Sequence, residues 1–113
     1  MRSSFHVSAT VDEDNGLIIF RINGEIDSPR LIDKWITTYS EIAEPWRYQR
    51  LFDYRRSSGI VEFEDLIRFA EWWRDRTQGV DYLSKVAVIV NNPLDQVRVN
   101  VVANLFPRDI RQS

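Results

Sequence analysis

The apolar run Val86-Ala87-Val88-Ile89-Val90 constrains the fold more than any other segment of the chain. It shows no polar alternation and is rich in β-branched residues, which is typical of a strand covered on both faces. Helical patterns lie between it and the earlier strands, and a helix that connects two strands makes those strands parallel. We therefore expect an α/β protein whose helices pack on a single sheet.

The first 22 residues predict an antiparallel hairpin. Phe5, Val7 and Ala9 alternate with polar residues, which is the period of two that indicates a strand with one wet face. A second apolar run occupies 17–22. The pair Asn15-Gly16 between the two runs supplies the positive φ angles that a tight reversal needs.

Two helices are predicted after the hairpin. Ser28-Pro29 places a hydroxyl acceptor and a preset φ at the start of the first helix, which should end near Glu44-Pro45. A third strand, 49–54, follows. The second helix has an acidic opening and a basic end, as its macrodipole favours. Its expected buried stripe consists of Phe63, Leu66, Ile67, Ala70 and Trp73.

The final element is ambiguous, because 97–101 alternates like a strand whereas Leu94, Val97, Val101 and Leu105 keep helical spacing. The capping sequence Asn91-Asn92-Pro93 decides for a helix. The predicted architecture is a mixed sheet with an N-terminal antiparallel hairpin followed by parallel strands. Its order is ββαβαβα, in one domain that spans 1–113.

Composition excludes several function classes. The chain has no cysteine, which removes disulfides, thiolate nucleophiles and cysteine metal sites. Its 15 basic and 17 acidic residues give a net charge of -2, so we expect no nucleic-acid partner unless Arg55, Arg56, Arg74 and Arg76 cluster. No apolar leader and no membrane-length run appear, which predicts a cytoplasmic protein without a membrane span.

Several segments in register resemble the SpoIIAA-like proteins, also described as STAS/Sec14-type domains. The similar segments are Gly16 to Glu25, Leu51 to Arg55, Val86 to Asn91 with Pro93, and Val102 to Phe106. The resemblance implies a small cytoplasmic bacterial α/β domain that acts by binding rather than by turnover. The family pattern usually continues into another strand and helix, and 107–113 is too short for both. We therefore expect either one strand fewer or a second subunit on the exposed flank.

The segment from Asp53 to Gly59 is the candidate polar site, since it is expected to leave the carboxyl end of a strand. In the related anti-sigma-factor antagonists, a serine of an Asp-Ser-Ser-Gly-Leu-Gly motif is phosphorylated at a helix start. Ser57-Ser58-Gly59 is similar to that motif, but an arginine replaces its acid, and we favour an ordinary loop over a phosphoswitch.

Asp53, Arg55 and Arg56 could bind an anion or a headgroup, and the favoured alternative is a structural ion pair. His6, the sole histidine, lies on the polar face of its strand and has no second histidine or cysteine as a metal-ligand companion. The sequence therefore predicts no metal site, no cofactor and no catalytic residues.

The aromatic residues and the last helix suggest a contact surface. On a helical wheel Trp72 and Phe69 lie away from the expected buried stripe, so Trp72 should be partly exposed. Val99, Val102 and Phe106 form a second apolar face on the final helix. Such a face either meets the core or contacts another chain.

These patterns favour a non-enzymatic binding or regulatory domain, expected to be a homodimer built partly on the last helix. The alternative is a Sec14-like carrier of an apolar small molecule or lipid, with Phe69, Trp72, Val99 and Phe106 lining a cavity. A hydrolase or transferase that uses Asp53 and Ser57 has the least support.

Overall fold

The computed structural model describes residues 5–80, 84–90 and 109–112. These residues form five strands, two α-helices and one 3-10 helix. In chain order the elements are β1 (His6–Asp12), β2 (Leu17–Glu25), α1 (Ser28–Ser40), η1 (Pro45–Arg47), β3 (Gln49–Ser58), α2 (Phe63–Arg76), β4 (Ser84–Ile89) and β5 (Asp109–Gln112).

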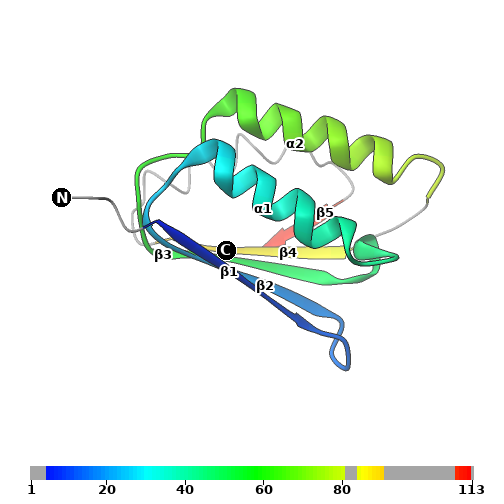
Figure 1. Cartoon of the computed structure of the whole chain (residues 1–113). Helices are drawn as coiled ribbons and strands as arrows, with labels where there is room; N and C mark the ends of the chain where they lie inside the picture. The colour runs from blue at the N-terminus through cyan, green and yellow to red at the C-terminus, as the bar shows by residue number, and fades with distance from the viewer. Residues whose placement is uncertain (1–4, 81–83, 91–108, 113) are drawn as a thin grey trace.

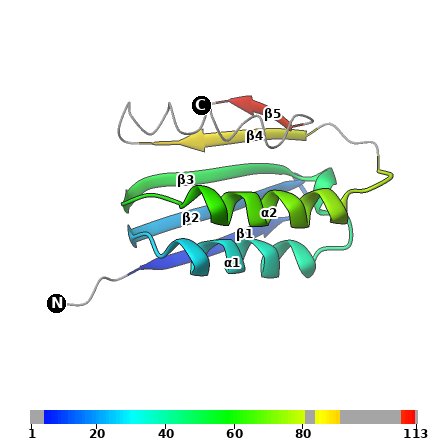
Figure 2. The same ribbon diagram turned by 90° about the horizontal axis from the view of Figure 1, so that it is seen from above.

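The strands form one mixed sheet in the order β1-β2-β3-β4-β5, so neighbours in the sequence of strands are also neighbours in space. β1 pairs antiparallel with β2, and every later pairing is parallel. Figure 1 shows α1 and α2 side by side on one face of this sheet, and Figure 2 shows them from above. The predicted α/β class and the hairpin followed by parallel strands are confirmed.

The core lies between the two helices and the sheet. β2 contributes its alternate residues Ile18, Phe20 and Ile22, all of which are buried, because a strand points every second side chain to the same face. The Phe20 ring contacts Tyr39 of α1 at a centroid distance of 5.5 Å and Phe52 of β3 at 5.2 Å. Edge and offset contacts of this kind add to the stabilisation from burial alone.

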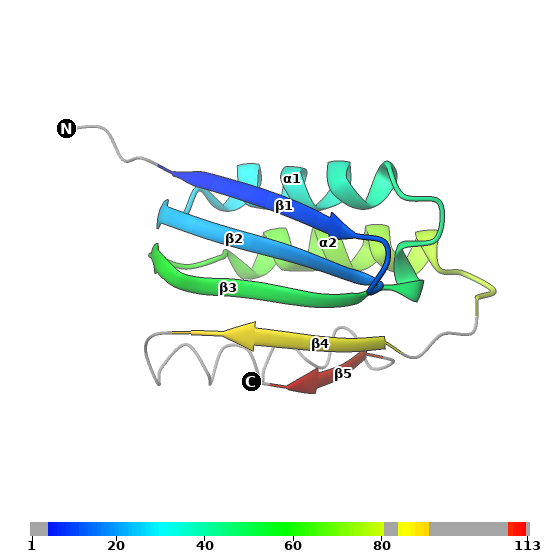
Figure 3. The same cartoon turned by 90° about the horizontal axis from the view of Figure 1, so that it is seen from below.

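The opposite face of the sheet is only half-buried in the described part of the chain. Figure 3 shows this face, with the helices behind the strands. In β4, Val86 and Val88 are buried under the helices, whereas Ala87 and Ile89 are half-buried on the other side. The prediction that this strand is covered on both faces is therefore confirmed on the helical side. On the other side the strand is half-buried.

Local capping differs from the prediction in two places. The N-cap of α1 is Asp27, whose carboxylate accepts a hydrogen bond from the backbone N–H of Arg30 at 3.3 Å, and Ser28 is already helical. In the hairpin turn only Gly16 has a positive φ, of 59°. The carboxylate of Asp12 accepts hydrogen bonds from both the backbone and the side chain of Asn15, which holds the turn without a second left-handed residue.

The first helix ends earlier and the third strand ends later than predicted. α1 stops at Ser40, and η1 begins at Pro45, so the proline starts the short 3-10 helix rather than ending α1. β3 extends to Ser58, four residues beyond the predicted end, because β2 continues to pair with it through Glu25 and Ser58. The segment expected to be a loop is therefore strand.

The predicted buried stripe of α2 is wrong at its first member. Phe63 is 53% exposed, whereas Leu66, Ala70 and Trp73 are buried as expected. Phe63 is the first residue of the helix, and helical side chains lean toward the N-terminus, so its ring projects past the end of the layer that the rest of the stripe covers.

Residues 109–112 correct another prediction. Residues 109–112 form β5, which pairs parallel with β4 from Ser84↔Asp109 to Ala87↔Gln112. The sheet thus has a fifth strand where the sequence suggested one strand fewer or a covering subunit. The predicted last helix, with Val99, Val102 and Phe106, lies outside the described residues. No helix in the described ranges is long and apolar enough to cross a membrane.

Candidate functional site

The candidate site lies where β2 and β3 end and α1 and α2 begin. Each parallel strand runs into the helix that follows it, so both helix N-termini reach the same edge of the sheet (Figure 1). Ligands of open α/β sheets gather at this carboxyl edge. Gly59, with a φ of 85°, ends β3 and turns the chain toward α2.

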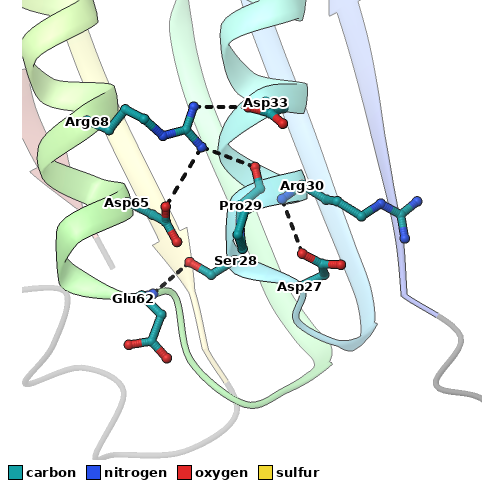
Figure 4. A network of polar contacts seen from close by, with 8 residues as sticks. All are labelled: Asp27, Ser28, Pro29, Arg30, Asp33, Glu62, Asp65 and Arg68. Atoms are coloured by element: carbon teal, nitrogen blue, oxygen red, sulfur yellow. Dashed lines mark hydrogen bonds and ion pairs between the residues drawn. The ribbon is translucent and has the colours of Figure 1, made fainter.

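A network of polar contacts fixes the two helix starts relative to each other (Figure 4). The hydroxyl oxygen of Ser28, on α1, accepts a hydrogen bond from the backbone N–H of Glu62 at 2.8 Å. Arg68 of α2 donates to the Asp33 carboxylate at 3.0 Å and to the Pro29 carbonyl oxygen at 3.3 Å. This hydrogen bond joins the 59–62 connection to α1, and Ser28 is buried.

Asp53 and Arg55 form an ion pair on β3. The guanidinium of Arg55 donates to both carboxylate oxygens of Asp53, at 3.0 and 2.9 Å, and the backbone N–H of Arg55 donates as well. The side-chain hydrogen bonds from Arg55 lower the pKa of the Asp53 carboxyl. A carboxylate held in this way is a structural partner for arginine rather than a general base.

An irregularity in the pairing of β2 and β3 places Arg56 near this pair. Arg21 pairs with Asp53 and Asn23 pairs with Arg56, so one residue of β2 faces two residues of β3. Arg21 and Asn23 lie on the same face of β2, and their partners Asp53 and Arg56 therefore share that face. The open face of the sheet thus carries Arg21, Arg55 and Arg56 together with Asp53.

The two serines do not have the arrangement of a phosphoswitch or a nucleophile. Ser57 and Ser58 lie in β3, and α2 begins only at Phe63, so neither serine is at a helix start. The Ser57 hydroxyl donates to the Tyr54 carbonyl oxygen at 2.8 Å. Burial raises the pKa of the Tyr54 phenol, which keeps this neighbour neutral.

Two apolar residues at this edge were not predicted as site residues. Ile60 is 40% exposed and Phe63 is 53% exposed, and Glu62, which donates to Ser28, lies between them in the sequence. The sequence placed Phe63 in a buried stripe because its spacing is helical. Its position at the very start of the helix was the signal that could have indicated exposure.

The predicted aromatic site residues pack with the core. Phe69 is 3% exposed and stacks on Tyr39 at a centroid distance of 5.7 Å. Trp72 is half-buried, as predicted, and stacks on Phe69 at 6.0 Å. Both side chains therefore contact other aromatic rings of the helical layer. The other members of that set, Val99 and Phe106, lie outside the described residues, as does Val102.

The four arginines named as a potential nucleic-acid patch lie on two different elements. Arg76 is the last residue of α2, where it donates to the Ile42 carbonyl oxygen at 2.9 Å, whereas Arg56 lies on β3, which leads into the opposite end of α2. The four arginines named as a potential nucleic-acid patch thus do not gather. His6 is exposed on β1, and the described residues include no cluster of acids and histidine that could hold a metal ion.

The α/β sheet with two helices on one face is the class of fold that the sequence resemblance predicts. No family model matches the chain, and no curated protein matches it. Among solved structures the chain is similar to an uncharacterized protein of the DUF3478 family from Shewanella loihica, which has a SpoIIAA-like fold. The match covers 100% of this chain and 88% of that chain, with a TM-score of 0.53 and 13% sequence identity. The chain therefore has a SpoIIAA-like fold.

Proposed function

We propose that this chain is a non-enzymatic binding or regulatory domain of a bacterial cytoplasm, a single domain that acts through contact with another protein. Its principal contact residues are Ile60 and Phe63. The observation that carries the proposal is the exposure of these two large apolar side chains at the β3–α2 connection.

The position of Ile60 and Phe63 supports a contact role. Two large exposed apolar side chains lie three residues apart here, and an aromatic anchor beside a polar rim is the usual composition of an interaction site. Ser58 and Glu62 supply polar groups next to the pair. The Ser28–Glu62 bond holds the connection in place before a partner binds, which lowers the entropy lost on association.

The chemistry of the polar residues favours binding over turnover. Catalysis by a serine needs a base within hydrogen-bond distance of the hydroxyl, whereas the Ser57 hydroxyl donates to a backbone carbonyl oxygen. Asp53 is occupied by Arg55. Arg56 and Arg21 remain on the open face as cations for an acidic region of a partner.

Self-association as a homodimer is part of the proposal. Val99, Val102 and Phe106 are candidates for that contact, and they lie outside the described residues. Native mass spectrometry of the gently purified protein separates this form of contact from the carrier alternative. A binding module gives oligomer or complex masses, whereas a carrier retains a lipid mass on a single chain.

The direct test replaces both exposed apolar side chains, Ile60→Ser with Phe63→Ser, and compares proteins retained from a lysate of the source organism. The wild-type chain is expected to retain a discrete polypeptide in stoichiometric amount, and the double variant is expected to lose it. The control is Glu41→Ser with Glu71→Ser, which changes two exposed side chains away from the β3–α2 connection. Equal retention by the wild-type chain and the double variant would contradict the proposal.

A further inference from the structure

β1 is an edge strand with an unpaired side. It bonds to β2 along its whole length, and within the described residues no backbone group of another element bonds to it. Figure 3 shows β1 along the rim of the sheet. An edge of this kind presents a row of free N–H and C=O groups that can pair with an additional strand.

Three features that often block such an edge, namely lysine, proline and a bulge, are missing from β1. Its seven residues contain no lysine and no proline, and its pairing with β2 has no bulge. Natural edge strands carry one or more of these devices, because an unprotected edge recruits other chains. Val11, with 39% of its surface exposed, adds an apolar side chain to the same strand.

A groove lies between the start of this edge strand and α1. Its volume is about 410 Å³, and its walls come from residues 5–7 on one side and from Arg30, Asp33, Lys34 and Thr37 on the other. A groove between an edge strand and a helix accepts an extended peptide. The peptide backbone bonds to the strand, while alternate side chains lie under the helix.

The charges in the groove select the side chains that fit there. Arg30 lies over the Phe5 ring at 5.4 Å, and in Figure 4 its guanidinium points away from the polar network and toward β1. Asp33 is already paired with Arg68 at 3.0 Å. No carboxylate in the described ranges forms an ion pair with Arg30 or Lys34, so the groove presents two cations.

We propose that the β1–α1 groove binds an extended acidic segment of a partner protein, which adds a strand to the β1 edge and places its carboxylates against Arg30 and Lys34. The methylene groups of the acidic side chains pack on Phe5 and Val7. The inference rests on the proposed protein-contact function and deepens it by naming a second surface and the chemistry of its partner.

The probe is an acetylated, amidated nine-residue peptide in which threonine and glutamate alternate. Binding is followed by the backbone amide resonances of β1 and α1. The glutamate peptide is expected to bind at least about tenfold more tightly than the matched threonine–lysine peptide, because opposite charges meet in the groove. Shifts should concentrate on β1 residues and on Arg30 and Lys34.

Backbone pairing is tested with two methylated peptides. In a strand, successive N–H groups point to opposite edges, so the glutamate N–H groups all face one way and the threonine N–H groups face the other. N-methylation of one set should abolish binding, and N-methylation of the other set should leave most of it. Equal effects of the two methylations would overturn the added strand.

The side-chain contact is tested with Arg30→Glu combined with Lys34→Glu. This variant is expected to lose about tenfold in affinity for the glutamate peptide and to gain affinity for the lysine peptide. Arg74→Glu with Lys85→Glu makes the same charge change at exposed positions outside the groove, and it should bind like the wild type.

Three results would overturn the inference. They are a glutamate peptide that fails to bind at millimolar concentration, an affinity unchanged by Arg30→Glu with Lys34→Glu, and protection of β1 by a second copy of the chain instead of the peptide. If any of them occurs while Ile60 and Phe63 still retain a polypeptide, the groove inference fails alone. The proposed protein-contact function then survives.

Discussion

Phe20 and Phe63 are the same residue type in two regions of opposite character. Phe20 is completely buried in the layer between α1 and the sheet, and it contacts three other aromatic rings. Phe63 stands at the β3–α2 connection with 53% of its surface exposed. The difference separates apolar residues that fill the core from apolar residues that remain exposed at the start of α2.

The buried region should respond most strongly to truncation. Phe20→Ala removes a ring that contacts Trp35, Tyr39 and Phe52, and a cavity remains because these neighbours also hold one another. We expect a loss of about 3–5 kcal/mol in the free energy of unfolding, measured by urea denaturation. Phe63→Ala is the control and should change stability by less than about 1 kcal/mol. Similar losses for the two variants would remove the distinction between the regions.

Loss of the hydrogen bond between Ser28 and Glu62 should have an intermediate effect on stability. Ser28→Ala leaves the Glu62 N–H without its acceptor, so we expect a loss of about 1–2 kcal/mol in the free energy of unfolding. Ser40→Ala is the matched control, because Ser40 is an exposed serine of the same helix. Faster amide exchange over 59–62 in Ser28→Ala alone would show that this bond orders the connection. Unchanged amide exchange would show that the order of residues 59–62 does not depend on the bond to Ser28.

The ion pair on the open face should have a smaller effect that depends on pH. The pKa of Asp53 is lowered in the folded state, so its contribution to stability is present above the ordinary carboxyl pKa and is lost as pH falls through the folded value. Asp53→Asn should therefore be less stable than the wild type at pH 7, and the gap should close on acidification. Urea midpoints measured from neutral to acidic pH check this. A gap that persists at low pH would assign the difference to something other than the carboxylate charge.

The sequence predicts the fold well where the spacing of apolar residues within one element indicates which face of that element is buried. The alternation of β2 and the spacing of Leu66, Ala70 and Trp73 place side chains against the helices and the sheet, and these residues are buried. The resemblance to SpoIIAA-like proteins and the structural similarity agree on the fold. Strand pairing beyond Tyr54 was missed, because the extension of β3 depends on β2 and not on β3 itself.

The candidate site was predicted only in part. The pairing of Asp53 with Arg55 follows from their spacing of two along a strand, which puts both on one face. The position of Arg56 on that face depends on an irregularity opposite Arg21 and Asn23, which no local sequence signal marks. The exposure of Phe63 depends on where α2 begins, and the groove beside β1 depends on how β1 and α1 pack. The periodicity of the sequence predicts neither feature.

The smallest effect on stability and the largest effect on contact should come from Ile60→Ser with Phe63→Ser. Since both side chains are already partly in water, we expect a change in the free energy of unfolding within about 1 kcal/mol. The measurement that tests the central claim most directly is the amount of retained partner polypeptide for the wild type and this variant, with each shown to be folded. We predict a folded variant that has lost the polypeptide. Full retention by the folded variant would contradict the assignment of these two residues to contact.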